Sequence, residues 1–99
     1  MNTQSITEIA ICTVRDREAA EAARRAAMDA VRHYPGFVRW QALTALDQDD
    51  MIADIVEWRD KAAADAAADK VRRDPAFAPY MAAISAVTIM RHFKAQETI

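Results

Sequence analysis

Four stretches of this chain are apolar or β-branched over the short lengths that are typical of β-strands. We predict these strands at Ile6–Val14, Phe37–Leu46, Met51–Trp58 and Ala86–Phe93. The first of them is largely apolar on both faces, which is typical of a central strand that is covered on both sides. The polar stretch Asp47–Asp50 lies between the second and third strands and predicts a hairpin loop.

The segment after the first strand has the longer period of an amphipathic helix. Asp16 is expected to cap a helix over Ala19–His33, which ends before Pro35 and Gly36. Its inner face is predicted to be small, with Ala19, Ala23, Ala26, Ala27, Ala30 and Val31. Its outer face is predicted to be solvated, with Glu21, Arg24, Arg25, Asp29 and Arg32. Gly36 is the only glycine, so we expect a backbone conformation there that other residues resist.

Two further helices are predicted after the third strand. Asp60 is expected to cap the first, Lys61–Val71, whose alanines have a high helix propensity. Asp74 and Pro75 are expected to cap and begin a second, short helix. Its inward face carries Phe77, Tyr80, Met81 and Ile84. Alanine-rich helix faces permit tight packing on a sheet, and they also leave room for a ligand, so both interpretations stay open.

The predicted order β-α-β-β-α-β is that of a ferredoxin-like α+β sandwich. We predict a single domain over residues 1–99, with its core over about 6–93 and a polar tail over 94–99. Its four-stranded antiparallel sheet should have the strand order 4-1-3-2, with the helices on one face. Because strands one, three and four are apolar on both sides, the other face needs a cover. The simplest cover is a second copy of the chain, in a homodimer.

Composition narrows the class of protein. With 99 residues, 53% of them hydrophobic and 28% charged, the chain is typical of one globular domain. A net charge of -2 without a basic stripe gives no indication of nucleic acid binding. The single cysteine fits a reducing compartment, the first residues lack the blocks of a signal peptide, and no apolar run is long enough to span a bilayer. We therefore expect a cytoplasmic protein that binds neither nucleic acid nor membrane.

Three short motifs are similar to those of a known family. They are Pro35-Gly36-Phe37, Glu57-Trp58-Arg59-Asp60, and Asp74-Pro75-Ala76-Phe77 followed by Tyr80. With these motifs the chain resembles, from about Ile6 to Phe93, the antibiotic biosynthesis monooxygenase-like proteins of the dimeric α+β barrel superfamily. The resemblance implies a homodimer that joins two sheets, and a pocket between the helices and the sheet of each protomer.

The resemblance also implies an activity. Cofactor-free members of the family oxidise polycyclic phenols to quinones, whereas haem-degrading relatives use an asparagine, a tryptophan and a histidine. Trp58 matches that tryptophan, and no histidine lies in the helix after it. The only asparagine, Asn2, lies outside the first strand, where Thr7 and Glu8 are the nearest polar residues. The resemblance therefore implies a monooxygenase without a cofactor and argues against haem degradation.

The predicted hairpin supplies the candidate site residues. If it is centred on Gln48 and Asp49, then Arg39 faces Trp58 and Leu43 faces Asp54. One face then carries Arg39, Gln41, Asp54 and Trp58. The other face carries Val38, Trp40, Ala42, Ile55 and Glu57. A slip of one residue would rearrange both sets.

Two interpretations of the face with Trp58 stay open. In the first it is a pocket for a small aromatic or phenolic ligand, which Trp58, Gln41 and Tyr80 bind. There Arg39 stabilises a developing oxyanion and Asp54, or a nearby histidine, moves a proton. In the second, Arg39 and Trp58 form a cation–π pair, and Asp54 forms a salt bridge with a second subunit. The first interpretation gives a catalytic role to Asp54 and Arg39, and the second gives none.

Other reactive side chains add little to the prediction. His33 ends a helix, where a solvated position is usual, and His92 near the end of the fourth strand is expected at the surface or an interface. The two histidines are not at metal-ligand spacing, so no metal site is predicted. Cys12 is expected to be a small buried hydrophobe. Three functions stay open: a cofactor-free monooxygenase, a non-catalytic ligand-binding dimer, and a proton-transfer isomerase.

Overall fold

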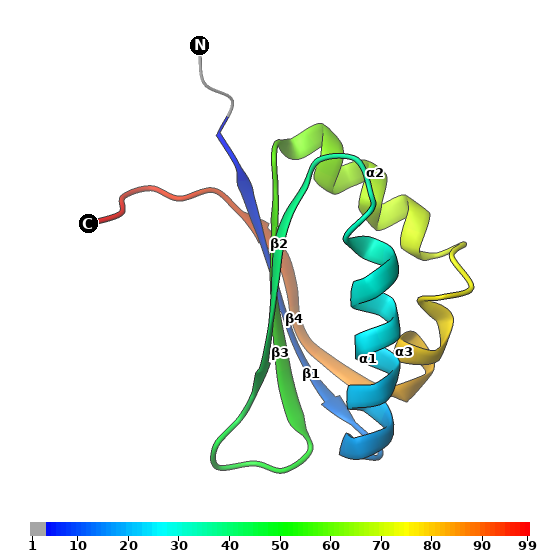
Figure 1. Ribbon diagram of the computed structural model, residues 1–99. Coiled ribbons are helices and arrows are strands. Elements are labelled where there is room, and N and C mark those ends of the chain that lie inside the picture. The colour runs from blue at the N-terminus through cyan, green and yellow to red at the C-terminus, as the bar shows by residue number, and fades with distance from the viewer. Residues whose placement is uncertain (1–3) are drawn as a thin grey trace.

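The computed structural model describes residues 4–99, and Met1–Thr3, with Asn2, lie outside the described residues. Its elements run β1 (Ile6–Val14), α1 (Arg17–Val31), β2 (Phe37–Thr44), β3 (Met51–Trp58), α2 (Lys61–Val71), α3 (Ala78–Ala83) and β4 (Ile84–Phe93). The strands form one antiparallel sheet in the order β2-β3-β1-β4, and the helices lie together on one face of it (Figure 1). The predicted ferredoxin-like α+β fold and its strand order are confirmed.

Side chains at the helix starts explain where the first two helices begin. The carboxylate of Asp16 accepts a hydrogen bond from the backbone N–H of Ala19 at 3.1 Å, and that of Asp60 accepts one from Ala63 at 2.8 Å. Each therefore satisfies a backbone N–H that has no partner within the helix. Both predicted caps are confirmed.

The third helix begins later than predicted. It starts at Ala78 with no side-chain cap, and Asp74 instead shapes the preceding turn by accepting from the N–H of Ala76 at 2.9 Å. The carboxylate of Asp74 also accepts a hydrogen bond from the hydroxyl of Tyr34 at 2.6 Å. This turn is thereby tied to the end of α1. Strand β4 follows α3 directly at Ile84, two residues earlier than expected.

The inner face of α1 differs from the predicted one. Its buried residues are Ala20, Arg24, Ala27 and Val31, at the 4-3-4 spacing of a helix stripe. The prediction that Arg24 is solvated is wrong, because this stripe passes through it and not through Ala19 or Ala26. A charged residue therefore enters the interior between α1 and the sheet.

A close approach between the β2 entry and α2 requires the only glycine. Gly36 has φ +80°, which L side chains rarely adopt, and a Cβ there would lie 2.3 Å from the Cβ of Ala63. The prediction that this position needs an unusual backbone conformation is confirmed. The turn brings α2 onto the end of the sheet where Trp58 is buried.

The sheet face away from the helices carries a group of apolar side chains. In the strand register this outer face carries Ile9, Ile11, Ile55, Ile89 and Phe93, with Leu43 on the edge strand. Leu43, Ile89 and Phe93 are about 36–44% exposed, and no helix formed by residues 4–99 lies on that side (Figure 1). None of the described helices is long and apolar enough to cross a membrane. The homodimer that would cover this face stays a prediction.

Candidate functional site

Strands β2 and β3 pair in a register that differs by one residue from the predicted one. Asp54 faces Ala42, and Leu43 faces Ala53, because the loop is centred on Gln48 alone. A shift of one residue moves every side chain of a strand to the other face. The predicted grouping of Arg39 and Gln41 with Asp54 and Trp58 is therefore wrong.

The residues that the prediction placed beside Trp58 lie on the outer face. Arg39 faces Glu57 across the strands, and its Nε lies 3.6 Å from a Glu57 carboxylate oxygen. Gln41 faces Ile55. The alternative cation–π pair is wrong for the same reason, since the ring of Trp58 contacts Phe37 edge-on at 5.7 Å between centroids. The sheet twist and the exposed edge leave Arg39 63% exposed.

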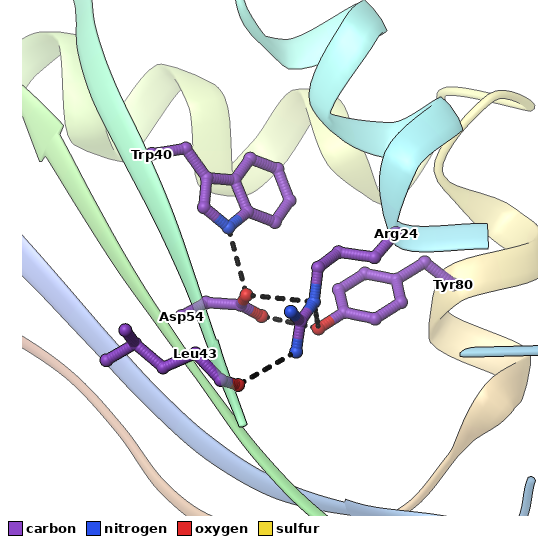
Figure 2. Close-up of polar contacts among 5 residues, drawn as sticks. All are labelled: Arg24, Trp40, Leu43, Asp54 and Tyr80. Carbon is purple, nitrogen blue, oxygen red and sulfur yellow. Dashed lines mark hydrogen bonds and ion pairs between the residues drawn. The ribbon is translucent and has the colours of Figure 1, made fainter. Parts of the chain in front are cut away.

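Trp40 takes the place beside Asp54 that the prediction gave to Arg39. Its indole Nε1 donates to Oδ1 of Asp54 at 2.9 Å, and the hydroxyl of Tyr80 donates to Oδ2 at 2.5 Å (Figure 2). The Nε of Arg24 lies 3.3 Å from Oδ1 and completes a buried ion pair. Asp54 is only 5% exposed. Its salt bridge is thus within the chain, and the expected salt bridge to a second subunit is wrong.

Arg24 itself is held by further acceptors. It donates from Nη2 to the backbone carbonyl of Leu43 and from Nε to the hydroxyl of Tyr80, both at 3.3 Å (Figure 2). Burial, followed by the charge of Asp54, raises the pKa of Tyr80, so its hydroxyl stays protonated and serves as a donor. This network joins α1, β2, β3 and α3. A buried charge is stable only when it is paired and hydrogen-bonded, as Asp54 and Arg24 are.

A cavity of about 320 Å³ lies between the sheet and the helices. Its walls include four aromatic side chains, Trp40, Trp58, Phe77 and Tyr80. Small residues of the sheet and of α2, such as Ala10 and Ala67, leave this space open. Of the predicted site residues, Asp54, Trp58 and Tyr80 line the cavity, whereas Arg39 and Gln41 do not. Their roles as catalytic or ligand-binding residues stay predictions.

The cavity opens beside the edge strand β4. The lining residues Met81, Val87 and Met90 are 48%, 58% and 47% exposed. They form an apolar rim around a mostly apolar interior, which is the usual character of a small-molecule site.

A second group of polar side chains lies at the Trp58 end of the cavity. The indole Nε1 of Trp58 donates to Oε1 of Glu8 at 3.3 Å, and Nε2 of His92 lies 3.4 Å from the same oxygen. Burial raises the pKa of Glu8 more than these two neighbours lower it. Sequence reasoning assigned no role to Glu8 and expected His92 at the surface or an interface. One indication of this group was present in the sequence, because Glu8 is the only acidic residue within the otherwise largely apolar β1.

The remaining titratable groups give no further centre. Burial raises the pKa of the Cys12 thiol, which agrees with its prediction as a small buried hydrophobe. Within residues 4–99, no three side chains of histidine, cysteine, aspartate or glutamate gather as metal ligands would. The polar groups that line the cavity are therefore two carboxylates, indole and phenol donors, and the guanidinium of Arg72 at the end of α2.

The fold and the cavity define a class of protein: a ferredoxin-like α+β domain with a cavity between its helices and its sheet. Solved structures of antibiotic biosynthesis monooxygenase-like proteins share this fold over nearly the whole chain, and the predicted resemblance is confirmed. No protein-family model matches the sequence, and no curated protein matches it either.

Individual solved structures show how far the similarity in fold and sequence extends. SnoaB, a cofactor-independent oxygenase from Streptomyces nogalater, is 26% identical with a TM-score of 0.76, and the match covers 98% of each chain. A mutant of SnoaB matches over the same 98% shares with 25% identity and a TM-score of 0.79. A candidate antibiotic biosynthesis monooxygenase from Bordetella bronchiseptica has a TM-score of 0.81 over 98% of this chain and 100% of its own. Its identity of 13% shows a shared fold alone.

Proposed function

We propose that this protein is a homodimeric, cofactor-independent monooxygenase that oxidises a small aromatic or phenolic metabolite with dioxygen. The observation that carries the proposal is the cavity of about 320 Å³ beside Trp58, on a fold shared with the cofactor-independent oxygenase SnoaB. Its aromatic walls suit a flat ring system, and its two carboxylates lie within a mostly apolar space.

The reaction requires nothing beyond substrate, dioxygen and a base. A polycyclic phenol, or its ketone tautomer with a ring methylene, loses a proton and forms an electron-rich phenolate. One dioxygen then converts the methylene to a carbonyl and releases one water, so that the substrate supplies all four electrons. The chain's part is to bind the ring system, exclude bulk water and accept the proton. Asp54 or Glu8 is the carboxylate that could accept it, and both line the cavity.

Oxygen-dependent turnover tests the proposal. A panel of mono-, di- and tricyclic phenols is incubated with the purified protein in air and under argon, and quinone formation is followed by absorbance. We expect a quinone only in air, with one dioxygen consumed per quinone. The matched control is the Trp58→Phe variant, which keeps an apolar wall but loses the hydrogen bond to Glu8. Equal rates with protein and with buffer for every phenol would contradict the proposal.

A second candidate is a non-catalytic ligand-binding dimer. The observation that favours it is the full occupation of Asp54 by Trp40, Tyr80 and Arg24, which leaves that carboxylate engaged in structure. A thermal-shift screen distinguishes the two, because ligand binding raises the Tm by mass action whether or not turnover follows. Stabilisation without product favours the binding protein. Loss of substrate without oxygen consumption instead indicates the proton-transfer isomerase.

The dimer in this proposal is formed through the outer face of the sheet. Ile89 and Phe93 are 39% and 44% exposed there, next to the half-buried Ile9, Ile11 and Ile55. An exposed apolar surface of this kind favours association in water. A second copy placed sheet against sheet would bury it and leave both cavities on the outside of the pair.

A further inference from the structure

A carboxylate that lines the cavity pairs with an imidazole on the neighbouring strand, at the Trp58 end of the cavity. Glu8 of β1 and His92 of β4 are directly paired in the sheet register, and Nε2 of His92 lies 3.4 Å from Oε1 of Glu8. Trp58 donates to that same oxygen. Both contacts therefore use one oxygen of Glu8. The other oxygen, Oε2, takes part in neither contact, and Glu8 is one of the residues that line the cavity.

The other carboxylate of the cavity is poorly suited to accept a proton. Oδ1 of Asp54 receives Trp40 and Arg24, and Oδ2 receives Tyr80. Protonation of Asp54 would remove the counter-charge of Arg24, which is only 5% exposed. An unpaired buried charge is strongly unfavourable. Glu8 has no buried guanidinium beside it, because its basic neighbour is the side chain of His92, which is one-third exposed.

We propose that Glu8 is the group that removes the substrate proton, with Trp58 and His92 as the residues that position its carboxylate and tune its charge. This inference rests on the proposed function, because it names the base for that reaction. The C–H bond of the ring methylene breaks, its proton passes to Oε2 of Glu8, and its electron pair enters the ring to form the phenolate. After dioxygen has oxidised the phenolate, the proton leaves Glu8 in the water that is released.

The surroundings of Glu8 support this role. Burial raises its pKa, and a carboxylate with a raised pKa is a stronger base than a solvated one. The charged groups that face it are His92 from β4, which lowers the pKa, and Asp54 from β3, which raises it. Arg72 from α2 lines the same cavity and offers a cation for the phenolate that forms.

Deuterium exchange under argon isolates the proton transfer from the oxidation. Anthrone, a tricyclic ketone with a methylene between two aromatic rings, is incubated with the protein in D₂O, and loss of the methylene proton signal is followed by NMR. We expect the wild-type protein to exchange this proton faster than buffer. Glu8→Gln keeps the size of the side chain and an oxygen for Trp58, and we expect it to lower the protein-dependent rate by about 10²–10⁴-fold, as loss of a general base does.

Control variants separate this role from a structural one. Glu21→Gln removes a carboxylate from the exposed face of α1 and should exchange at the wild-type rate. His92→Asn removes the neighbour that lowers the pKa of Glu8, so the acidic limb of the rate–pH profile should move to higher pH. If Glu8→Gln does not fold, this shift still tests the inference with a folded protein. An unchanged limb in His92→Asn, or wild-type exchange in Glu8→Gln, would overturn it.

The two proposals fail in different ways. Exchange under argon that depends on Glu8, without quinone in air, retains Glu8 as the base and overturns the oxygenase in favour of the isomerase. Quinone formation in air that is unaffected by Glu8→Gln retains the oxygenase and overturns the role of Glu8. Wild-type exchange no faster than that in buffer overturns the role of Glu8 as well.

Discussion

The buried ion pair between Arg24 and Asp54 predicts a large loss of stability when only one partner is removed. Arg24→Met keeps an unbranched side chain of similar length in α1 but leaves the carboxylate of Asp54 without its counter-charge. Breaking a buried pair in this way costs about 3–5 kcal/mol of unfolding free energy. The variant also loses the hydrogen bonds from Arg24 to Leu43 and Tyr80, so we expect the upper half of that range.

This loss is large for so small a protein. Domains have total unfolding free energies of about 5–15 kcal/mol, and each kcal/mol corresponds to roughly 4–8 °C in Tm for a domain of 60–100 residues. Arg24→Met should therefore lower the Tm by roughly 16–40 °C. Asp54→Asn should also destabilise the protein, because it leaves the guanidinium of Arg24 buried and unpaired. The double variant removes both charges, so its destabilisation should be less than the sum of the two by about 0.5–3 kcal/mol.

Urea and thermal unfolding followed by circular dichroism measure these free energies at one fixed protein concentration, which holds any contribution from dimerisation constant. The neighbouring residue on α1 supplies a matched control. Arg25 pairs with Asp29 at 3.2 Å, but both side chains are more than half exposed, so Arg25→Met should cost no more than about 0.5 kcal/mol. The reasoning is refuted if Arg24→Met costs as little as this control, or if the double variant is simply additive.

Three further predictions follow from single contacts. Gly36→Ala should destabilise the protein by about 1–3 kcal/mol or more, because φ +80° is strained for alanine and the new Cβ meets Ala63. In urea unfolding, the double variant with Ala63→Gly should recover part of this loss, and a Gly36→Ala variant as stable as the wild type would refute the close approach. Tyr34→Phe should raise the pKa of Asp74, because the hydrogen bond from the Tyr34 hydroxyl is the largest cause that lowers it. A lowered pKa in the folded state gives stability above about pH 4 that is lost as the pH falls through the folded-state pKa, so the stability of the variant should fall less on acidification, as NMR titration of the carboxyl and acid unfolding would reveal. Ile89→Lys on the outer face of the sheet should convert the proposed dimer to a monomer in analytical ultracentrifugation, while Glu21→Gln should not; a dimer that persists would place the interface elsewhere.

Local patterns in the sequence predict the fold. The capping carboxylates Asp16 and Asp60, the stop at Gly36 and the apolar strands β1 and β3 depend on neighbours within a few residues, so their positions follow from propensity and period. The apolar character of both faces of β1 likewise indicates its central place. These features are confirmed at the residues that carry them.

The site is less predictable because it depends on which sheet face each strand residue takes and on which residues of α1 point inward. Asp54, Trp58 and Tyr80 were predicted from their residue types and line the cavity, but Arg39 and Gln41 were assigned to the wrong face by a slip of one residue in the hairpin. Arg24 was missed because the helix stripe through Ala20, Ala27 and Val31 has alternatives one residue away. Among many alanines, hydrophobicity alone does not select between them.

The sequence by itself thus determined the order of elements, the caps of the first two helices and the strand that delivers Trp58 to the sheet end. Only the tertiary structure decided which polar groups meet there. Glu8 and His92 are 84 positions apart, and Arg24 and Tyr80 are 56 apart, so no local pattern links them. Their contacts arise from the strand register and the packing of helices on the sheet, which the whole chain settles together as it buries its apolar faces.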